Sequence, residues 1–130
     1  MAKLINDGRI QTQEQCKTSL KSIADALYVI GGKWKLQIII ALNPGNKRFN
    51  ELQRVVEGIS AKVLSAELKE LEINGFVRRN VFTGTPVTVE YELTQYANTL
   101  GSVLRSLDEW GAMHRETVKK SLRKKRPVAA

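Results

Sequence analysis

Few side chains in this 130-residue chain are of the types that carry out chemistry, and most of those act through hydrogen bonds and charge. Cys16 is the single cysteine and His114 the single histidine, so the sequence offers no disulfide framework, no multi-thiolate zinc site and no convincing Ser/His/Asp set. It also has no Gly-rich phosphate-binding loop. Instead, serines and lysines occur among apolar residues from Ser60 to Lys69, and two arginines follow at Arg78 and Arg79. Such groups suit non-covalent recognition of a polar partner, and we expect no enzyme, no metal and no cofactor.

The spacing of apolar residues predicts the elements that position this polar stretch. After an N-terminal arm over residues 1–15, a first helix is expected over residues 18–30, ended by a Gly-Gly pair. A second helix, over residues 33–42, is apolar nearly all round, which is typical of a buried helix at the centre of a core. A short third helix is expected over residues 50–56. Its inward-facing residues are predicted to be Phe49, Leu52, Val55 and Val56.

The Ser60–Lys69 stretch begins a fourth predicted helix. Ser60 suits an N-cap, because its hydroxyl can accept a hydrogen bond from a free amide of the first turn. Asn74-Gly75 indicates the end of this helix, since glycine tolerates the left-handed conformation that closes one. The apolar stripe of the helix consists of Leu64, Leu68 and Leu71. The polar residues of its first turns are therefore predicted to be exposed.

A β-hairpin and a long helix follow the polar stretch. Residues 77–82 and 87–93 read as two strands, and the second alternates strictly between apolar and polar residues. The loop over residues 83–86 contains glycine and proline, so an antiparallel pair is expected. Thr94 is predicted to cap the final helix. The fold class is therefore mainly α with a small antiparallel β-hairpin (α+β), in the order of a winged helix-turn-helix.

In this fold the second helix of the motif enters the DNA major groove, so the polar stretch acquires a candidate partner. Lysine can donate to guanine or to phosphate, and serine can donate or accept at several base edges. Arginines on a strand alternate between its faces, so one of the two should reach the DNA backbone or minor groove. The predicted DNA-binding residues are Arg48, Ser60, Ala61, Lys62, Ser65, Lys69, Arg78, Arg79, Thr83, Gly84 and Thr85. The alternative is that these lysines and serines form only the solvated face of an amphipathic helix.

The net charge of +8 supports this interpretation only weakly, because of where the charge lies. Residues 116–130 hold six basic groups and one acidic group, and the rest of the chain holds fifteen basic and twelve acidic groups. We expect this basic C-terminal segment to be a frayed, solvated tail. No run is long and apolar enough to span a membrane, and the N-terminus is too polar for a signal peptide. A cytoplasmic protein without a membrane partner is therefore expected.

Several of these features together resemble the HxlR-type family of bacterial winged helix-turn-helix transcriptional regulators, which is related to the MarR group. The resemblance extends over roughly residues 16–112. The segments that carry it are Ile30–Trp34, Arg48–Leu52, Gly58–Ser60, Leu64, Leu68, Glu70-Leu71, Gly75, Val89–Thr94 and Trp110-Gly111. It implies a family domain over residues 16–115 and a homodimer on a palindromic DNA operator. The implied interface, on the first and last helices, comprises Leu20, Ile23, Leu27, Leu100, Val103, Leu104, Leu107 and Trp110.

The resemblance also draws attention to Cys16. Many members of the family carry a cysteine just before the first helix, and in some of them it senses oxidants or electrophiles. Those members usually have a proline next, whereas this chain has Lys17. A neighbouring lysine and a helix N-terminus would both stabilise a thiolate and raise its reactivity. The alternative is a small, buried apolar residue, which is a common role of free cysteine.

Two functional alternatives accompany the prediction of a DNA-binding repressor. The regulator could respond to a small-molecule effector in a pocket at the dimer helices. The residues proposed to line that pocket are Leu27, Tyr28, Trp34 and Trp110. The same fold could instead serve as a protein-interaction module, although such a module needs no basic wing. Repression is the expected mode, because a compact dimer on a promoter excludes polymerase without an activating surface.

Overall fold

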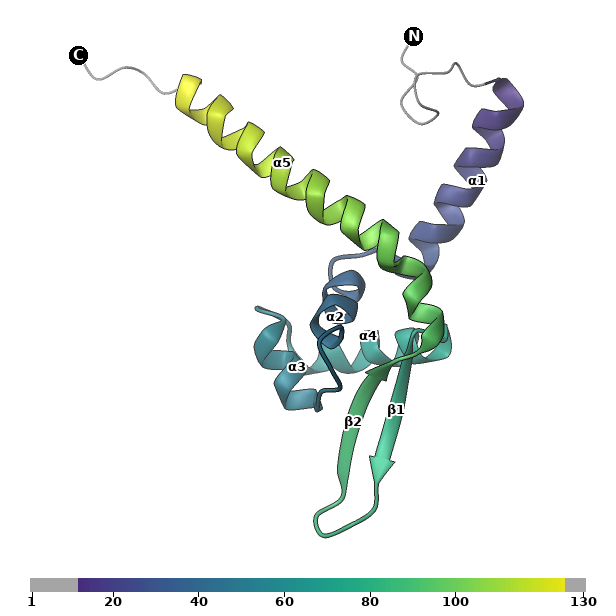
Figure 1. Ribbon diagram of the computed structural model, residues 1–130, viewed down its shortest axis with the longest axis vertical. Coiled ribbons are helices and arrows are strands. Elements are labelled where there is room, and N and C mark those ends of the chain that lie inside the picture. Colours follow the sequence, from purple (N-terminus) through teal and green to yellow (C-terminus); the bar gives the residue numbers. More distant parts are fainter. Residues whose placement is uncertain (1–11, 126–130) are drawn as a thin grey trace, which may run out of the picture.

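A computed structural model describes residues 12–125, which form a small winged helix-turn-helix body with three projecting parts (Figure 1). Two helices, α1 and α5, project from one end and diverge, and the hairpin projects from the opposite end. The predicted fold class, mainly helical with one antiparallel hairpin, is confirmed. In chain order the elements are α1 (Gln13–Ile30), α2 (Lys35–Leu42), α3 (Phe49–Val55), α4 (Ala61–Ile73), β1 (Val77–Phe82), β2 (Thr88–Leu93), the 3-10 helix η1 (Gln95–Leu100) and α5 (Gly101–Lys125).

The core lies where α2, α3, α4 and the base of the hairpin meet. Its fully buried side chains come from the three helices and are Ile38, Ile39, Leu52, Leu64, Leu68 and Leu71. The prediction that α2 is buried on all sides is wrong at Ile40, which is 52% exposed, and Val55 of α3 is 54% exposed rather than inward-facing. Both residues line a shallow hollow between α2 and α3, and Ile40 also borders a groove between α2 and the start of α5.

Helix α1 begins earlier than predicted, because a capping box precedes the apolar pattern. The Gln15 amide donates to Thr12 Oγ1 at 3.1 Å, and the Thr12 amide donates to Gln15 Oε1 at 2.8 Å. The polar residues between them lack apolar periodicity, so the predicted start at residue 18 was wrong. At the other end, a Cβ on Gly31 would lie 2.2 Å from the Leu27 carbonyl oxygen, so only glycine fits there. Residues 1–11 of the predicted arm lie outside the described part of the chain.

The hairpin is tied to the body at its base. In the antiparallel register, Arg78 faces Glu92 and Arg79 faces Tyr91 across the two strands. Lys47, just before α3, forms a single bridge to Tyr91 through two backbone hydrogen bonds of 2.7 and 3.1 Å. The base of the hairpin therefore has a third backbone partner, whereas its distal half projects as two strands alone (Figure 1).

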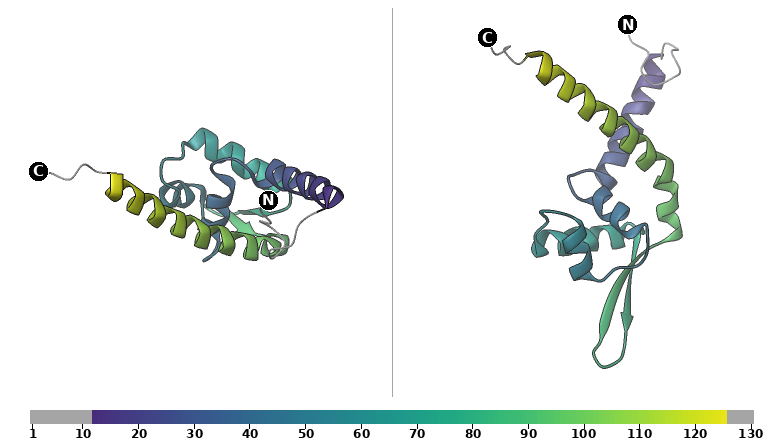
Figure 2. Two further views of the ribbon diagram at one scale, coloured as in Figure 1. Left: turned by 90° about the horizontal axis from the view of Figure 1, so that it is seen from above. Right: turned by 60° about the vertical axis from the view of Figure 1, so that its left-hand side comes forward.

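The C-terminal helix differs from the prediction at both ends. Thr94 does not cap α5; its hydroxyl donates to the Gly75 carbonyl at 2.5 Å, and η1 intervenes before α5 begins at Gly101. The helix then continues to Lys125, so a frayed tail was the wrong prediction for residues 116–125, while residues 126–130 lie outside the described range. The other views show α5 leading away from the body as one long rod (Figure 2). No helix within residues 12–125 is both long and apolar enough to cross a membrane.

Candidate nucleic-acid interface

The polar residues of α4 lie on its exposed side, as predicted. Ser60 caps the helix, since its Oγ accepts from the Val63 amide at 3.2 Å. Gly75, at φ +83°, ends it in the left-handed region that favours glycine. The inward stripe of leucines leaves the opposite side of the helix open to solvent. The exposed residues over positions 61–70 are Ala61, Lys62, Val63, Ser65, Ala66, Lys69 and Glu70.

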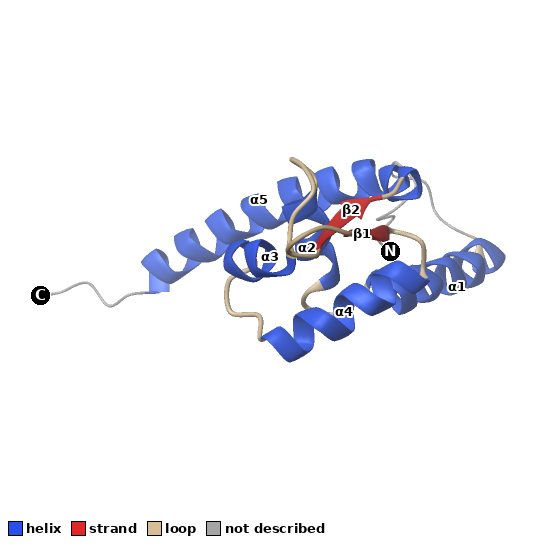
Figure 3. Ribbon diagram, turned by 90° about the horizontal axis from the view of Figure 1, so that it is seen from below, coloured by secondary structure: helices blue, strands red, loops and turns tan. Residues whose placement is uncertain are grey.

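The hairpin and α4 together form a hollow of about 400 Å³. Ser65 and Lys69 line it from α4, and Arg79 lines it from β1, so three predicted DNA-binding residues from two elements meet there. Glu72 and Tyr91 complete its polar lining. Seen from below, α3, α4 and the hairpin lie together at this end of the molecule (Figure 3). The arrangement presents donors and positive charge on a helix that has no other described element on its outer side.

Arg78 has a different environment from Arg79, although the two are adjacent. Its Nη1 donates to Glu92 Oε1 at 3.0 Å, and Asn80 Nδ2 donates to the same oxygen at 3.0 Å. Hydrogen bonds from Asn80 and then from Arg78 lower the pKa of the Glu92 carboxyl below its usual value. Successive strand residues face opposite sides, and the structure therefore assigns Arg79 to the α4 side and Arg78 to a cross-strand ion pair.

A buried lysine that the sequence did not single out connects α2 to α4. Lys35 is only 8% exposed, and its Nζ lies 2.6 Å from Glu67 Oε1 and 3.5 Å from Glu70 Oε1. The Glu67 hydrogen bond is the largest influence on the pKa of Lys35 and raises it, against the opposing effect of desolvation. The signal available in the sequence was a lysine inside an apolar helix. The ion pair fixes the rotation of α4 and with it the side that faces outward.

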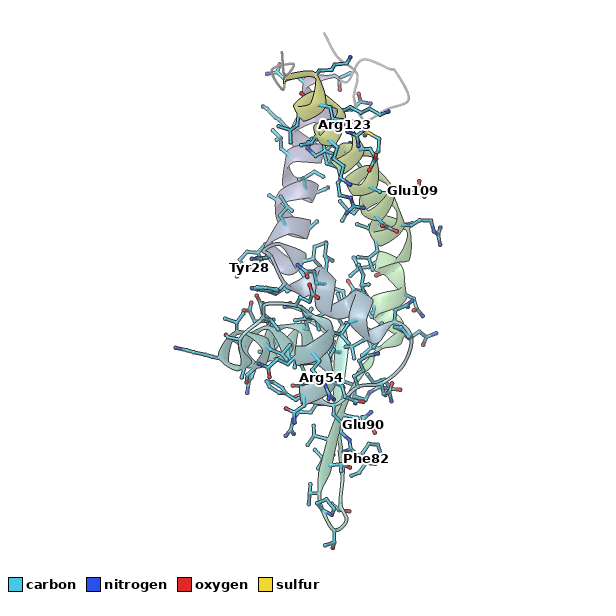
Figure 4. All side chains as sticks on the ribbon, turned by 90° about the vertical axis from the view of Figure 1, so that its left-hand side faces the viewer. Tyr28, Arg54, Phe82, Glu90, Glu109 and Arg123 are labelled. Atoms are coloured by element: carbon cyan, nitrogen blue, oxygen red, sulfur yellow. The ribbon has the colours of Figure 1, made fainter. Side chains whose placement is uncertain are left out.

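The remaining predicted contacts lie at the two edges of this face. Arg48 is exposed at the start of α3, where its backbone amide donates to Glu51 Oε1 at 2.8 Å. The loop residues Thr83, Gly84 and Thr85 are exposed at the far end of the hairpin. Arg54 of α3, labelled in Figure 4, is also exposed. It was not predicted, because one arginine on a short helix gives no distinguishing pattern.

Cys16 lies inside α1 rather than before it. Its amide donates to the Thr12 carbonyl at 3.0 Å, so it belongs to the first turns of the helix, and its side chain is exposed. The predicted position just before the first helix was therefore wrong, because the capping box at Thr12 starts the helix earlier. Within one chain the thiol is open to solvent rather than buried in the core.

The predicted interface residues separate into two groups. Leu100 and Leu104 are partly buried and pack against the core cluster, so within the chain they belong to the body. The others are open to solvent on α1 and α5. Their exposed fractions are Leu20 66%, Ile23 56%, Leu27 61%, Val103 41%, Leu107 49% and Trp110 58%. Trp110 also stacks on His114, with ring centroids 4.8 Å apart.

A groove of about 490 Å³ lies between α2 and the start of α5. Its apolar floor includes Ile39, Ala97 and Leu104, and its rim carries Arg105 and Asp108. None of the four residues predicted to line an effector pocket lies in this groove. Trp34 packs against the core instead, with the Lys33 ammonium 4.7 Å above its ring.

Comparison with known proteins identifies the family of this chain. Residues 29–119 match the model of the HxlR-like helix-turn-helix family. The chain belongs to the HxlR-like helix-turn-helix family. Its members are HTH-type transcriptional regulators rather than enzymes, and the HTH domain implies DNA binding.

Individual HxlR-like relatives agree with this assignment. The HTH-type transcriptional regulator YtcD of Bacillus subtilis is 44% identical over 93 residues, which are 72% of this chain and 74% of YtcD. A YtcD crystal structure superposes with a TM-score of 0.69 at 42% identity, covering 72% of this chain and 96% of the other.

Two further solved structures extend the comparison. The redox regulator HypR in its reduced form has a TM-score of 0.71 at 37% identity, with 76% of this chain and 98% of that chain covered. A MarR-family regulator from Enterococcus faecalis V583 has a TM-score of 0.66 at 35% identity. The match covers 88% of this chain and 99% of that chain. The chain is thus similar in structure to MarR-family regulators as well.

Proposed function

We propose that this chain is a homodimeric, sequence-specific repressor that places α4 in the major groove of a palindromic operator and its hairpin on the adjacent backbone and minor groove. The observation that supports this most directly is the hollow where Ser65 and Lys69 of α4 meet Arg79 of β1. Lys62, one helical turn before Ser65, extends the same exposed side. The serine and lysine side chains can hydrogen-bond to base edges, and the arginine can contact a phosphate.

The experiment that tests this function is selection of duplexes from a random library by the full-length protein, followed by affinity measurements at several salt concentrations. A selected palindrome that binds far more tightly than random duplex, with affinity falling steeply as salt rises, is the expected result. Failure to bind any duplex at low salt would exclude the function and favour a protein-interaction module. Lys62→Ala should weaken binding to the selected duplex by about tenfold.

Dimerisation is proposed on the projecting helices. Exposed apolar residues follow α5 at helical spacing from Val103 through Leu107 and Trp110, and another row follows α1. The two helices diverge within one chain, so neither covers the other's row (Figure 1). A second copy would bury both rows and present two recognition helices related by two-fold symmetry, as a palindrome requires.

An oxidant response through Cys16 is a finer part of this proposal. The thiol is exposed on α1, and the similar protein HypR is a redox regulator whose oxidised and reduced forms have both been solved. Two Cys16 thiols, one from each protomer, would form a disulfide and pass two protons and two electrons to the oxidant. Capping by a small thiol is the alternative product. Either change on α1 would reorient the recognition helices. Cys16→Ser should bind the selected duplex equally with and without oxidant, and a response like that of the wild type would exclude the mechanism.

The groove between α2 and α5 supports a second candidate, a small-molecule effector. Its volume and its apolar floor with a polar rim are typical of ligand sites. It also adjoins the start of α5, so a bound ligand could change the angle of that helix relative to the body. Screening the protein–operator complex against a compound library, with Leu104→Trp as a variant that fills the groove, tests this candidate. A compound that releases DNA from the wild type but not from the variant would support it.

A further inference from the structure

The groove between α2 and the start of α5 has four polar side chains around it. Asn43 follows α2, Asn98 lies in η1, and Arg105 and Asp108 lie one helical turn apart on α5. All four residues are exposed, and none of their side chains forms a hydrogen bond or an ion pair with another residue of the described range 12–125. The groove therefore offers one cation, one anion and two carboxamides to a ligand.

The floor between these polar side chains is apolar. Ile39 and Ala97 are buried there, and Leu93 and Leu104 are partly buried at its sides. Ile40, which is 52% exposed, lines both this groove and the shallow hollow between α2 and α3. A matching ligand therefore carries apolar groups as well as both signs of charge.

The proposed dimer would leave this groove open. Gly101, Arg105 and Asp108 share one side of α5, at spacings of four and three residues. The exposed apolar row from Val103 to Trp110 has the same spacing but begins two residues later, which is about 200° round the helix. The groove and the proposed interface therefore lie on nearly opposite sides of α5.

We propose that the groove binds a dipeptide with apolar side chains, which is the effector that controls DNA binding. This inference rests on the proposed function, in which the groove holds a small-molecule effector. The Arg105 guanidinium would bind the terminal carboxylate of the dipeptide, and the Asp108 carboxylate would bind its terminal ammonium. Side chains one turn apart on a helix have Cβ atoms about 5–6 Å apart. The two charged ends of an extended dipeptide are separated by about 6 Å.

The rest of the dipeptide matches the rest of the groove. The carboxamides of Asn43 and Asn98 can donate to the carbonyl and accept from the N–H of its one peptide bond. Its apolar side chains would cover the floor. A free amino acid has no peptide bond for the carboxamides, and an apolar carboxylic acid leaves Asp108 without a cation. Both should therefore bind more weakly.

Isothermal titration calorimetry on the full-length protein without DNA tests the binding, with leucyl-leucine and leucyl-phenylalanine as probes. At least one dipeptide should bind, and free leucine and N-acetyl-leucyl-leucine amide should bind at least tenfold more weakly. Arg105→Gln and Asp108→Asn should each weaken dipeptide binding by about tenfold. If neither dipeptide binds, or if the blocked dipeptide binds as tightly as the free one, the assignment is wrong.

Matched control variants change the same kinds of charge outside the groove. Arg115→Gln and Glu109→Gln lie at exposed positions of α5 and should bind the dipeptide as the wild type does. Circular dichroism verifies that each variant is folded. Equal loss of binding in the control and groove variants would mean that the overall charge of α5, rather than the groove, holds the dipeptide.

A separate measurement distinguishes this inference from the proposed function. A saturating dipeptide should lower the affinity of the wild type for its selected duplex at least tenfold, because a ligand joining α2 to α5 changes the angle between the body and the dimer helices. Arg105→Gln and Asp108→Asn should lose this response. An unchanged duplex affinity would overturn the effector role. Dipeptide binding by a protein that binds no duplex would overturn the proposed function but keep the site.

Discussion

Adjacent residues of one type can have opposite roles, and Arg78 and Arg79 show why. Strand geometry sends their side chains to opposite faces of the hairpin. On one face Glu92 and Asn80 engage Arg78, while on the other Arg79 lines the hollow beside α4. An arginine already paired with a carboxylate gains less from a phosphate, because it exchanges one anion for another. The two positions therefore predict different effects on DNA binding.

Arg79→Ala should weaken binding to the selected duplex and reduce the slope of log affinity against log salt by about one, as loss of one phosphate contact requires. Arg78→Ala is the matched control and should change that slope little. Fluorescence anisotropy at five salt concentrations measures both. An equal loss of slope in the two variants would contradict the assignment of Arg79 to the DNA side.

Lys35 supports a prediction about stability and its dependence on pH. Lys35→Met leaves Glu67 without its partner and should lower the free energy of unfolding by about 2 kcal/mol. The pKa of Lys35 is raised above its ordinary 10.5 in the folded chain. As the pH rises, the ion pair therefore keeps its full stabilising effect on the folded state up to about 10.5. Its contribution disappears as the pH rises through the folded-state pKa.

Urea unfolding at fixed protein concentration, at pH 7 and at successive alkaline pH values, measures this effect. The difference in unfolding free energy between wild type and Lys35→Met should be constant near neutrality and shrink in the alkaline range. Lys21→Met, at an exposed position on α1, is the control and should show no such difference. An unfolding free-energy difference between Lys35→Met and wild type that stays unchanged throughout the alkaline range would contradict the stated cause.

At the scale of elements, α4 depends on both its cap and its packing. Ser60 satisfies the Val63 amide, the leucine stripe buries one side of the helix, and the Lys35–Glu67 pair fixes its rotation. The N-terminus of α4 also carries the partial positive charge of the helix dipole toward the proposed DNA. Ser60 therefore affects both folding and DNA binding, and two substitutions at this position can separate the two effects.

Ser60→Ala should lower the free energy of unfolding by about 1 kcal/mol, because the first turn loses its cap. Ser60→Asp keeps a capping oxygen and should retain most of the stability. Its negative charge should nevertheless weaken DNA binding more than Ser60→Ala does, through repulsion from phosphate. Thermal unfolding and anisotropy on the same samples compare the three proteins. Tight binding by Ser60→Asp would mean that the start of α4 lies away from the duplex.

At the scale of the whole molecule, the recognition face and the apolar rows lie at opposite ends. The hairpin and α4 occupy one end, and α1 and α5 project from the other (Figure 1). A dimer formed on the projecting helices would leave both recognition faces free. On α5 the boundary between the folded body and the exposed apolar row lies between Leu104 and Leu107. Leu104 packs on the core, whereas Leu107 is 49% exposed.

Leu107→Glu should therefore convert the protein to a monomer and weaken binding to a palindrome by more than tenfold, with the body still folded. Leu104→Ala should instead lower the stability of the body by about 2 kcal/mol, because it deletes a partly buried side chain. Analytical ultracentrifugation and urea unfolding distinguish these outcomes. A dimeric Leu107→Glu protein would exclude the proposed interface.

The sequence by itself determined the order of elements, the leucine stripe of α4, the Ser60 cap and the Gly75 terminator. These features depend on periodicity and on local hydrogen bonds, which a few neighbouring residues decide. It could not determine the start of α1 from periodicity, because a capping box between Thr12 and Gln15 has no apolar signal.

Only the tertiary structure decided which of two adjacent arginines faces α4, that Leu104 belongs to the core, and that Lys35 is buried against Glu67. Each of these depends on contacts between residues far apart in the chain. A side chain's neighbours across space are set by how helices and strands pack, and the sequence pattern of one element does not contain that information.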